Sequence, residues 1–137
     1  MSSTSDALHA AQQKGLANRP KVGGFPYLAE VLRRAGVKTN RWHLPSCQSI
    51  YVLEGGAVVQ QMEPLLTGTA DIPQFDEAAL VRAIRTDQAG ESTFPEFLQA
   101  TWEAGITWYV VDFEARTVTY GGARDETYTE SYPEVAT

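Results

Sequence analysis

The sequence predicts an α+β fold in which two pseudo-symmetric αβββ repeats share one mostly antiparallel sheet, with helices packed on it. Two observations carry this prediction: amphipathic helical stretches alternate with short runs of β-branched and aromatic residues, and the whole order of elements occurs twice. A chain of 137 residues is about one domain's worth. We therefore expect a single domain over 1–137, with repeat 1 at about 5–65, a connector at about 66–75 and repeat 2 at about 76–133.

The repeat is identified from matches at one fixed offset of 69 residues (25 and 94, for example). The matches fall mainly on glycine, proline and aromatic residues, which are the less interchangeable types, and they need no gap. They are Phe25-Pro26 with Phe94-Pro95, Leu28 with Phe97, Ala35-Gly36-Val37 with Ala104-Gly105-Ile106, Tyr51 with Tyr120, and Pro64 with Pro133.

Start and stop signals flank the helical stretches. Thr93 and Glu96 have the spacing of a capping box, and Gly105 supplies a left-handed stop after the apolar stripe that follows them. In the first repeat, a stripe from Phe25 to Ala35 ends at Gly36. A further helix is expected before each unit, over 5–14 and 76–86.

Three strand-like runs follow in each repeat. The run from Ile106 to Phe113 is apolar on both alternating faces, which predicts a central strand and places Trp108 in the core. Gly55-Gly56 is interpreted as a hairpin turn and Gly121-Gly122 as the start of a loop. The expected strands span 37–44, 49–53, 57–62, 106–113, 117–120 and 126–131.

Composition excludes several classes of protein. The single cysteine, Cys47, leaves no partner for an internal disulfide and fits a reducing cytosol. No apolar run approaches the roughly 20 residues of a membrane helix, and residues 1–6 lack the basic start of a secretory signal. With two histidines and no phosphate-loop or dinucleotide motif, we expect no metal and no cofactor. These features predict a cytoplasmic protein without a membrane partner.

Charge is distributed unevenly along the chain. Residues 1–68 carry a net charge of +3 and residues 69–137 carry −9, which together give the overall −6. This asymmetry suggests that two halves or two copies face each other, so we expect a homodimer; two solvated surfaces without a partner are the alternative. The negative total argues against nucleic acid as the main partner.

The second repeat's segment RTDQAGESTFPEFLQATWEAGITWYVVDFEARTVTYGG resembles the YbcV-like, or "phage envelope protein"-like, family of bacteria and phages. In the first repeat, GGFPYLAEVLRRAGV and IYVLEGGAVV resemble the N-terminal half of that family. The likeness covers most of the chain and is weaker over KTNRWHLPSCQS. It implies a small, phage-related α+β domain. It implies no activity, because the family is a domain of unknown function.

One group of candidate catalytic residues follows from the offset, which maps His43 onto Asp112 and Tyr51 onto Tyr120. Equivalent residues near a pseudo-two-fold axis approach each other, so Asp112 would orient His43 for general acid–base chemistry with tyrosine hydroxyls nearby. The alternative is that Asp112 bonds a backbone N–H at the end of a strand and that His43 is simply exposed.

Three further residues are candidates for ligand binding. Arg41 lies in a basic cluster that suits a small anion, and its neighbour Trp42 suits the wall of a ligand pocket. Cys47 is either a thiolate nucleophile or a small buried residue. The function that we expect is a small binding or interaction module that holds a small molecule or a protein segment between its repeats. The alternative is a metal-independent enzyme that uses His43 and Asp112.

Overall fold

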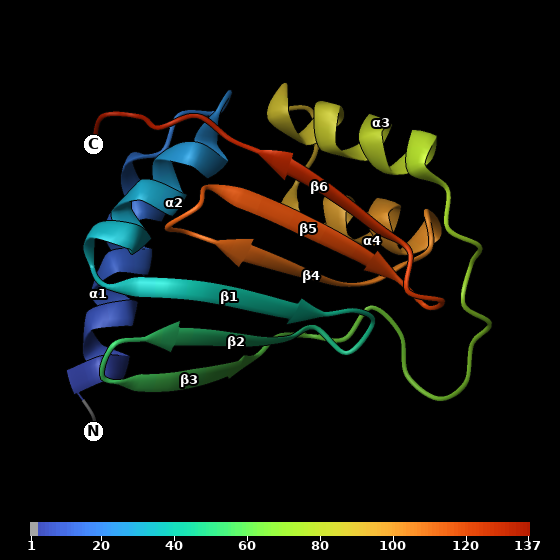
Figure 1. The fold of residues 1–137 in the computed structure, drawn as a ribbon, viewed down its shortest axis with the longest axis horizontal. Helices are drawn as coiled ribbons and strands as arrows, with labels where there is room; N and C mark the ends of the chain where they lie inside the picture. Colours follow the sequence, from blue (N-terminus) through green and yellow to red (C-terminus); the bar gives the residue numbers. More distant parts are fainter. Residues whose placement is uncertain (1–2) are drawn as a thin grey trace.

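The structure, a computed structural model, describes residues 3–137 as four helices and six strands (Figure 1). The helices are α1 (Ser3–Asn18), α2 (Gly24–Arg34), α3 (Glu77–Gln88) and α4 (Phe94–Glu103). The strands are β1 (Val37–His43), β2 (Gln48–Leu53), β3 (Gly56–Gln61), β4 (Ile106–Asp112), β5 (Thr117–Gly122) and β6 (Thr127–Ser131). They form one antiparallel sheet in the order β3-β2-β1-β4-β5-β6, which confirms the α+β class.

The helices cover one face of the sheet and leave the other face open (Figure 1). Burial alternates accordingly along β2, where Ser49, Tyr51 and Leu53 are buried while Val52 is 41% exposed. Contacts from α1, α3 and α4 all reach side chains on the buried side, which we call the helix-facing side: Gln12 with Gln60, Arg85 with Glu130, and Phe94 with Trp42.

The core lies between this side of the sheet and the helices. Its largest fully buried side chains include Phe113, Leu8, Leu80 and Ile106, which come from both halves of the chain. Burial of such side chains is the dominant stabilising contribution to folding. Within residues 3–137, no helix combines the length and the apolar character needed to cross a membrane.

The helix ends follow from local sequence. Thr93 Oγ1 accepts a hydrogen bond from the Glu96 N–H, and the Glu96 carboxylate accepts one from the Thr93 N–H, so the capping box is confirmed. Asp76 caps α3 by accepting from the N–H of Ala79. Helix α2 begins instead after Gly23, whose φ of 69° is left-handed and which offers no side-chain cap.

Two expectations about β4 and β5 are wrong, and one irregularity explains both. Ile106 and Tyr109 are both buried although they are three positions apart, because the register of β4 shifts between Ile106 and Trp108. Trp108 therefore points to the open face instead of the core. Its indole lies over Gly121, and β5 continues through Gly122, so Gly121-Gly122 do not open a loop.

Candidate functional site

The open face consists of three rows of side chains that cross all six strands. The pairing of neighbouring strands defines these rows. From β3 to β6, the first row is Gln61, Gln48, His43, Trp108, Gly121 and Thr127; the second is Val59, Ile50, Arg41, Val110, Thr119 and Thr129; the third is Ala57, Val52, Thr39, Asp112, Thr117 and Ser131. Arg41 and Asp112 are the two charged residues among these eighteen positions.

Arg41 and Trp108 form the centre of this face. The guanidinium carbon of Arg41 lies 4.7 Å from the centroid of the Trp108 ring, in a cation–π arrangement. A Cβ atom at Gly121 would lie 1.9 Å from Trp108 Cε2, so glycine is what allows the indole to lie close against β5. Within residues 3–137, no carboxylate forms an ion pair with Arg41.

The register separates the candidate catalytic residues. His43 is opposite Trp108 and Asp112 is opposite Thr39, which puts His43 and Asp112 four positions apart along the ladder. At about 3.3 Å per residue this is roughly 13 Å. Asp112 accepts hydrogen bonds from the backbone N–H groups of Glu114 (3.1 Å) and Ala115 (3.0 Å). The structure thus gives Asp112 the turn-capping role and does not bring it to His43.

The tyrosines of that constellation lie on the opposite side of the sheet from His43 and Asp112. Tyr51 and Tyr120 are helix-facing and buried, and burial raises the pKa of both phenols. Trp42 is also helix-facing, 6% exposed, and stacks on Tyr109 with ring centroids 6.1 Å apart. Burial raises the pKa of Tyr109 as well. The candidate residues therefore divide between two faces, with His43 and Asp112 on one and Tyr51 and Tyr120 on the other.

Cys47 is buried in the turn between β1 and β2, where its N–H donates to the His43 carbonyl over 2.8 Å. Its φ of 59° is left-handed, and burial raises the pKa of its thiol. A raised thiol pKa and a buried position both oppose the nucleophilic role considered for this residue.

We expect native Cys47 to react with iodoacetamide at pH 8 at least about 100-fold more slowly than the same thiol in urea-unfolded protein. The physical reason is that alkylation requires an exposed thiolate, and Cys47 is 1% exposed with a raised pKa. Mass spectrometry of the adduct over time gives both rates. A native rate within a few-fold of the unfolded rate would contradict the burial of the thiol, and only a native rate well above the unfolded rate would restore the nucleophile hypothesis.

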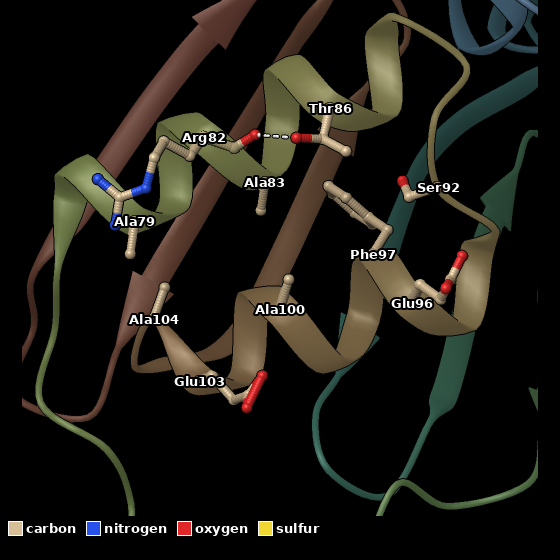
Figure 2. A pocket seen from close by; sticks show the side chains of 10 residues that line it. All are labelled: Ala79, Arg82, Ala83, Thr86, Ser92, Glu96, Phe97, Ala100, Glu103 and Ala104. Atoms are coloured by element: carbon tan, nitrogen blue, oxygen red, sulfur yellow. Dashed lines mark hydrogen bonds between the residues drawn. The ribbon is translucent and has the colours of Figure 1, made fainter.

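A groove of about 460 Å³ lies between α3 and α4 (Figure 2). Ala79 and Ala83 from α3 face Ala100 and Ala104 from α4, with Phe97 near one end. The hydroxyl of Thr86, on its wall, donates to its own helix at the Arg82 carbonyl over 2.8 Å. The groove is therefore a consequence of small side chains at a helix–helix contact, and Thr86, Ser92 and Glu96 on its wall are already hydrogen-bonded within the chain. A second hollow, of about 400 Å³, lies between residues 72–75 and residues 123–126.

Residues 13–131 match the family described as "Protein of unknown function (DUF1398)". The chain belongs to the DUF1398 family. Two mycobacterial relatives, uncharacterized protein Rv2012 of Mycobacterium tuberculosis and uncharacterized protein Mb2035 of Mycobacterium bovis, are each 53% identical to it over 135 residues. The matched region covers 98% of this chain and 82% of each relative. These matches support a family of unknown function, and the YbcV-like, phage-related assignment stays a prediction.

The site of this DUF1398 protein is only partly visible in its sequence. Arg41 is a candidate on sequence grounds, but Trp108, which lies under its guanidinium, has the pattern of a core residue. The available signal is a tryptophan on the strand that pairs with a Gly-Gly dipeptide, since a glycine leaves room for a large ring on the neighbouring strand. Within residues 3–137, no three His, Cys, Asp or Glu side chains gather in a way that could hold a metal ion.

Proposed function

We propose that this protein is a binding module and that its open face, centred on Arg41 and Trp108, binds a segment of a partner protein. One observation carries the proposal: the other five members of the row of Arg41 are apolar or hydroxyl side chains, and this arginine has no carboxylate partner among the described residues. Removing a surface of this composition from water costs little free energy, and one charge remains available for recognition.

The depletion of charge on the open face supports an interface. Charged residues make up 20% of the chain, but two of the eighteen positions on this face, and Asp112 is engaged by its own turn. Val52 and Val59 are 41% and 59% exposed. The half-buried Ile50 pairs with Val59 and lies two residues before Val52 on β2. Contiguous exposed apolar side chains mark interaction surfaces, whereas isolated ones are ordinary.

The site lies where the two halves of the chain meet, which agrees with a duplicated unit that binds between its repeats. Arg41 pairs with Val110, its own equivalent 69 residues later (110 − 41). At the same offset, Gly36 and Gly105 have φ of 96° and 88°, and Cys47 and Arg116 have φ of 59° and 55°. These coincidences favour a pseudo-two-fold relation about the Arg41–Val110 pair.

The size of the face favours a short segment over a second copy of the chain. Six strands about 4.8 Å apart and three rows about 6.7 Å apart give an area of roughly 600 Å². A stable complex of standard size buries about 800 Å² on each partner. A two-fold homodimer centred here would also place two Arg41 side chains together without an opposing carboxylate. Neither of the two hollows described above is lined by residues of the open face, and small molecules bind in concave sites, which likewise favours a protein segment.

The test is site-specific photocrosslinking in the native host. A benzoylphenylalanine at position 59, on the open face, is expected to yield a crosslinked species of one defined mass. The matched control places the same residue at position 16 on α1, because Leu16 (55% exposed) and Val59 (59% exposed) are similarly accessible. Equal crosslinking at both positions, or none at position 59, would refute the proposal. A crosslinked product of twice the 15.0 kDa chain mass would identify a second copy as the partner and also refute it.

A further inference from the structure

We propose that Arg41 and Trp108 form a carboxylate-recognition site, and that the segment bound on the open face presents an acidic side chain flanked by apolar residues. This inference rests on the proposed function and adds the chemistry of the partner. Three features carry it: how Trp108 is held, how Arg41 is oriented, and what surrounds them.

Trp108 is held against the sheet and does not depend on a ligand for its position. The indole lies close against Gly121 of β5, where a Cβ atom would lie within 2.3 Å of the ring atoms Cε2, Cζ2 and Nε1. The Thr107 hydroxyl donates to the Gly121 carbonyl over 3.4 Å, across the irregular part of the β4–β5 ladder. The ring thus forms a fixed platform that reaches across β4 and β5.

Arg41 lies over this platform and pairs with no carboxylate of the described residues. The guanidinium carbon lies 4.7 Å from the ring centroid, an arrangement that restricts the side chain while the edge of the guanidinium that carries its N–H donors remains available. Four other arginines, Arg33, Arg34, Arg85 and Arg116, are each paired with a glutamate. Asp112, the acid among the eighteen positions of the open face, is occupied by two backbone N–H groups of its turn.

The surroundings favour a carboxylate attached to an apolar chain. Arg41 lies between Ile50 and Val110 in its row, and Val59 follows at the β3 edge. Apolar neighbours that become covered on binding lower the local dielectric and strengthen the charge-assisted hydrogen bonds of an Arg–carboxylate pair. Because the guanidinium is already restricted by the indole, less conformational entropy is lost on binding.

The direct test is an NMR titration that follows the Arg41 Nε–H and Trp108 Nε1–H signals at constant ionic strength. The probes are N-acetyl-Val-Glu-Val-amide and its glutamine analogue, which differ in one charge and keep the same shape. We expect saturable shifts at millimolar concentration with the acidic peptide and at least tenfold weaker binding of the neutral one. R41Q should reduce binding of the acidic peptide at least tenfold. R82Q, which removes an exposed arginine of α3, should leave it unchanged.

Equal affinity for the two peptides, equal effects of R41Q and R82Q, or no saturable shift would each overturn the carboxylate site. Crosslinking at position 59 separates this failure from failure of the proposed function. If R41Q leaves the position-59 crosslink intact, the open face still binds a partner but not through a carboxylate on Arg41. If the crosslink falls at least tenfold in R41Q and persists in R82Q, both proposals stand.

Discussion

Replacing Gly105 with alanine is expected to lower the free energy of unfolding by about 2 to 5 kcal/mol. Gly105 follows α4 with a φ of 88°, a conformation that costs an L-amino acid roughly 1–2 kcal/mol. An added Cβ would also lie 2.5 Å from the carbonyl oxygen of Gln74. That neighbour is backbone of the connector before α3, and it cannot rotate away as a side chain could. Relief of the clash therefore requires the connector to move.

The connector is held in place next to Gly105, which is why movement is costly. The Asp76 N–H donates to the Ala104 carbonyl over 2.8 Å, and the Asp76 side chain caps α3. Displacing Gln74 therefore strains both this hydrogen bond and the start of the helix. Overpacking of this kind typically costs about 1–3 kcal/mol beyond the backbone strain.

Gly36 supplies the matched control. Its φ is 96°, close to that of Gly105, but a Cβ atom added to Gly36 would have no neighbour within 4 Å. Gly36→Ala should therefore lower the free energy of unfolding only by the roughly 1–2 kcal/mol that a left-handed backbone conformation costs alanine. Urea denaturation of both variants measures the difference, which is the contribution of the connector contact. Equal losses of unfolding free energy in the two variants would show that the Gln74 backbone can move without cost. The contact with Gly105 would then not constrain the connector.

Local signals predict the elements of this fold well. Thr93 and Glu96 determine the start of α4 through contacts three residues apart, and the run from Ile106 to Phe113 is β-branched and aromatic enough to specify a strand. Such signals depend on near neighbours in the sequence. The fold class, most strand boundaries and the capping box are predictable for this reason.

The candidate site depends instead on the register between β1 and β4, which no local signal determines. His43 would meet Asp112 if the two strands were shifted by four positions, but Arg41 pairs with Val110 instead. The irregularity before Trp108 is equally non-local, because it decides which of Trp108 and Tyr109 reaches the core. A match at a fixed offset in the sequence gives no distance between the matched residues.

Replacing Glu30 with glutamine is expected to lower the free energy of unfolding at pH 7 by about 3 kcal/mol. Glu30 is 3% exposed on α2, and its carboxylate accepts from Arg33 at 2.6 Å and Arg34 at 3.0 Å, with Arg116 of the β4–β5 turn 3.5 Å away. Glutamine keeps the size of the side chain but removes the charge that these guanidinium groups surround. The loss measures these three contacts together, of which two lie within α2 and one connects α2 to the β4–β5 turn.

Glu114 provides the control for this change. It forms an exposed ion pair with Lys38 at 3.5 Å and is itself 66% exposed. Solvent screens such a pair, so Glu114→Gln should change stability by less than about 0.5 kcal/mol. Comparable losses in Glu30→Gln and Glu114→Gln would indicate that burial of Glu30 adds nothing.

The same glutamate makes stability depend on pH in a defined direction. Hydrogen bonds from Arg33, against the opposing effect of burial, hold the pKa of Glu30 at about 2, below its usual 4.5. Because the folded-state pKa is the lower one, the stabilisation is fully present above pH 4.5 and is lost as the pH falls towards 2. Urea denaturation of wild type and Glu30→Gln at pH 7, 4.5 and 3 should show their difference shrinking only below pH 4.5. A difference that stays constant down to pH 3 would mean that the loss in Glu30→Gln comes from packing and not from the carboxylate charge.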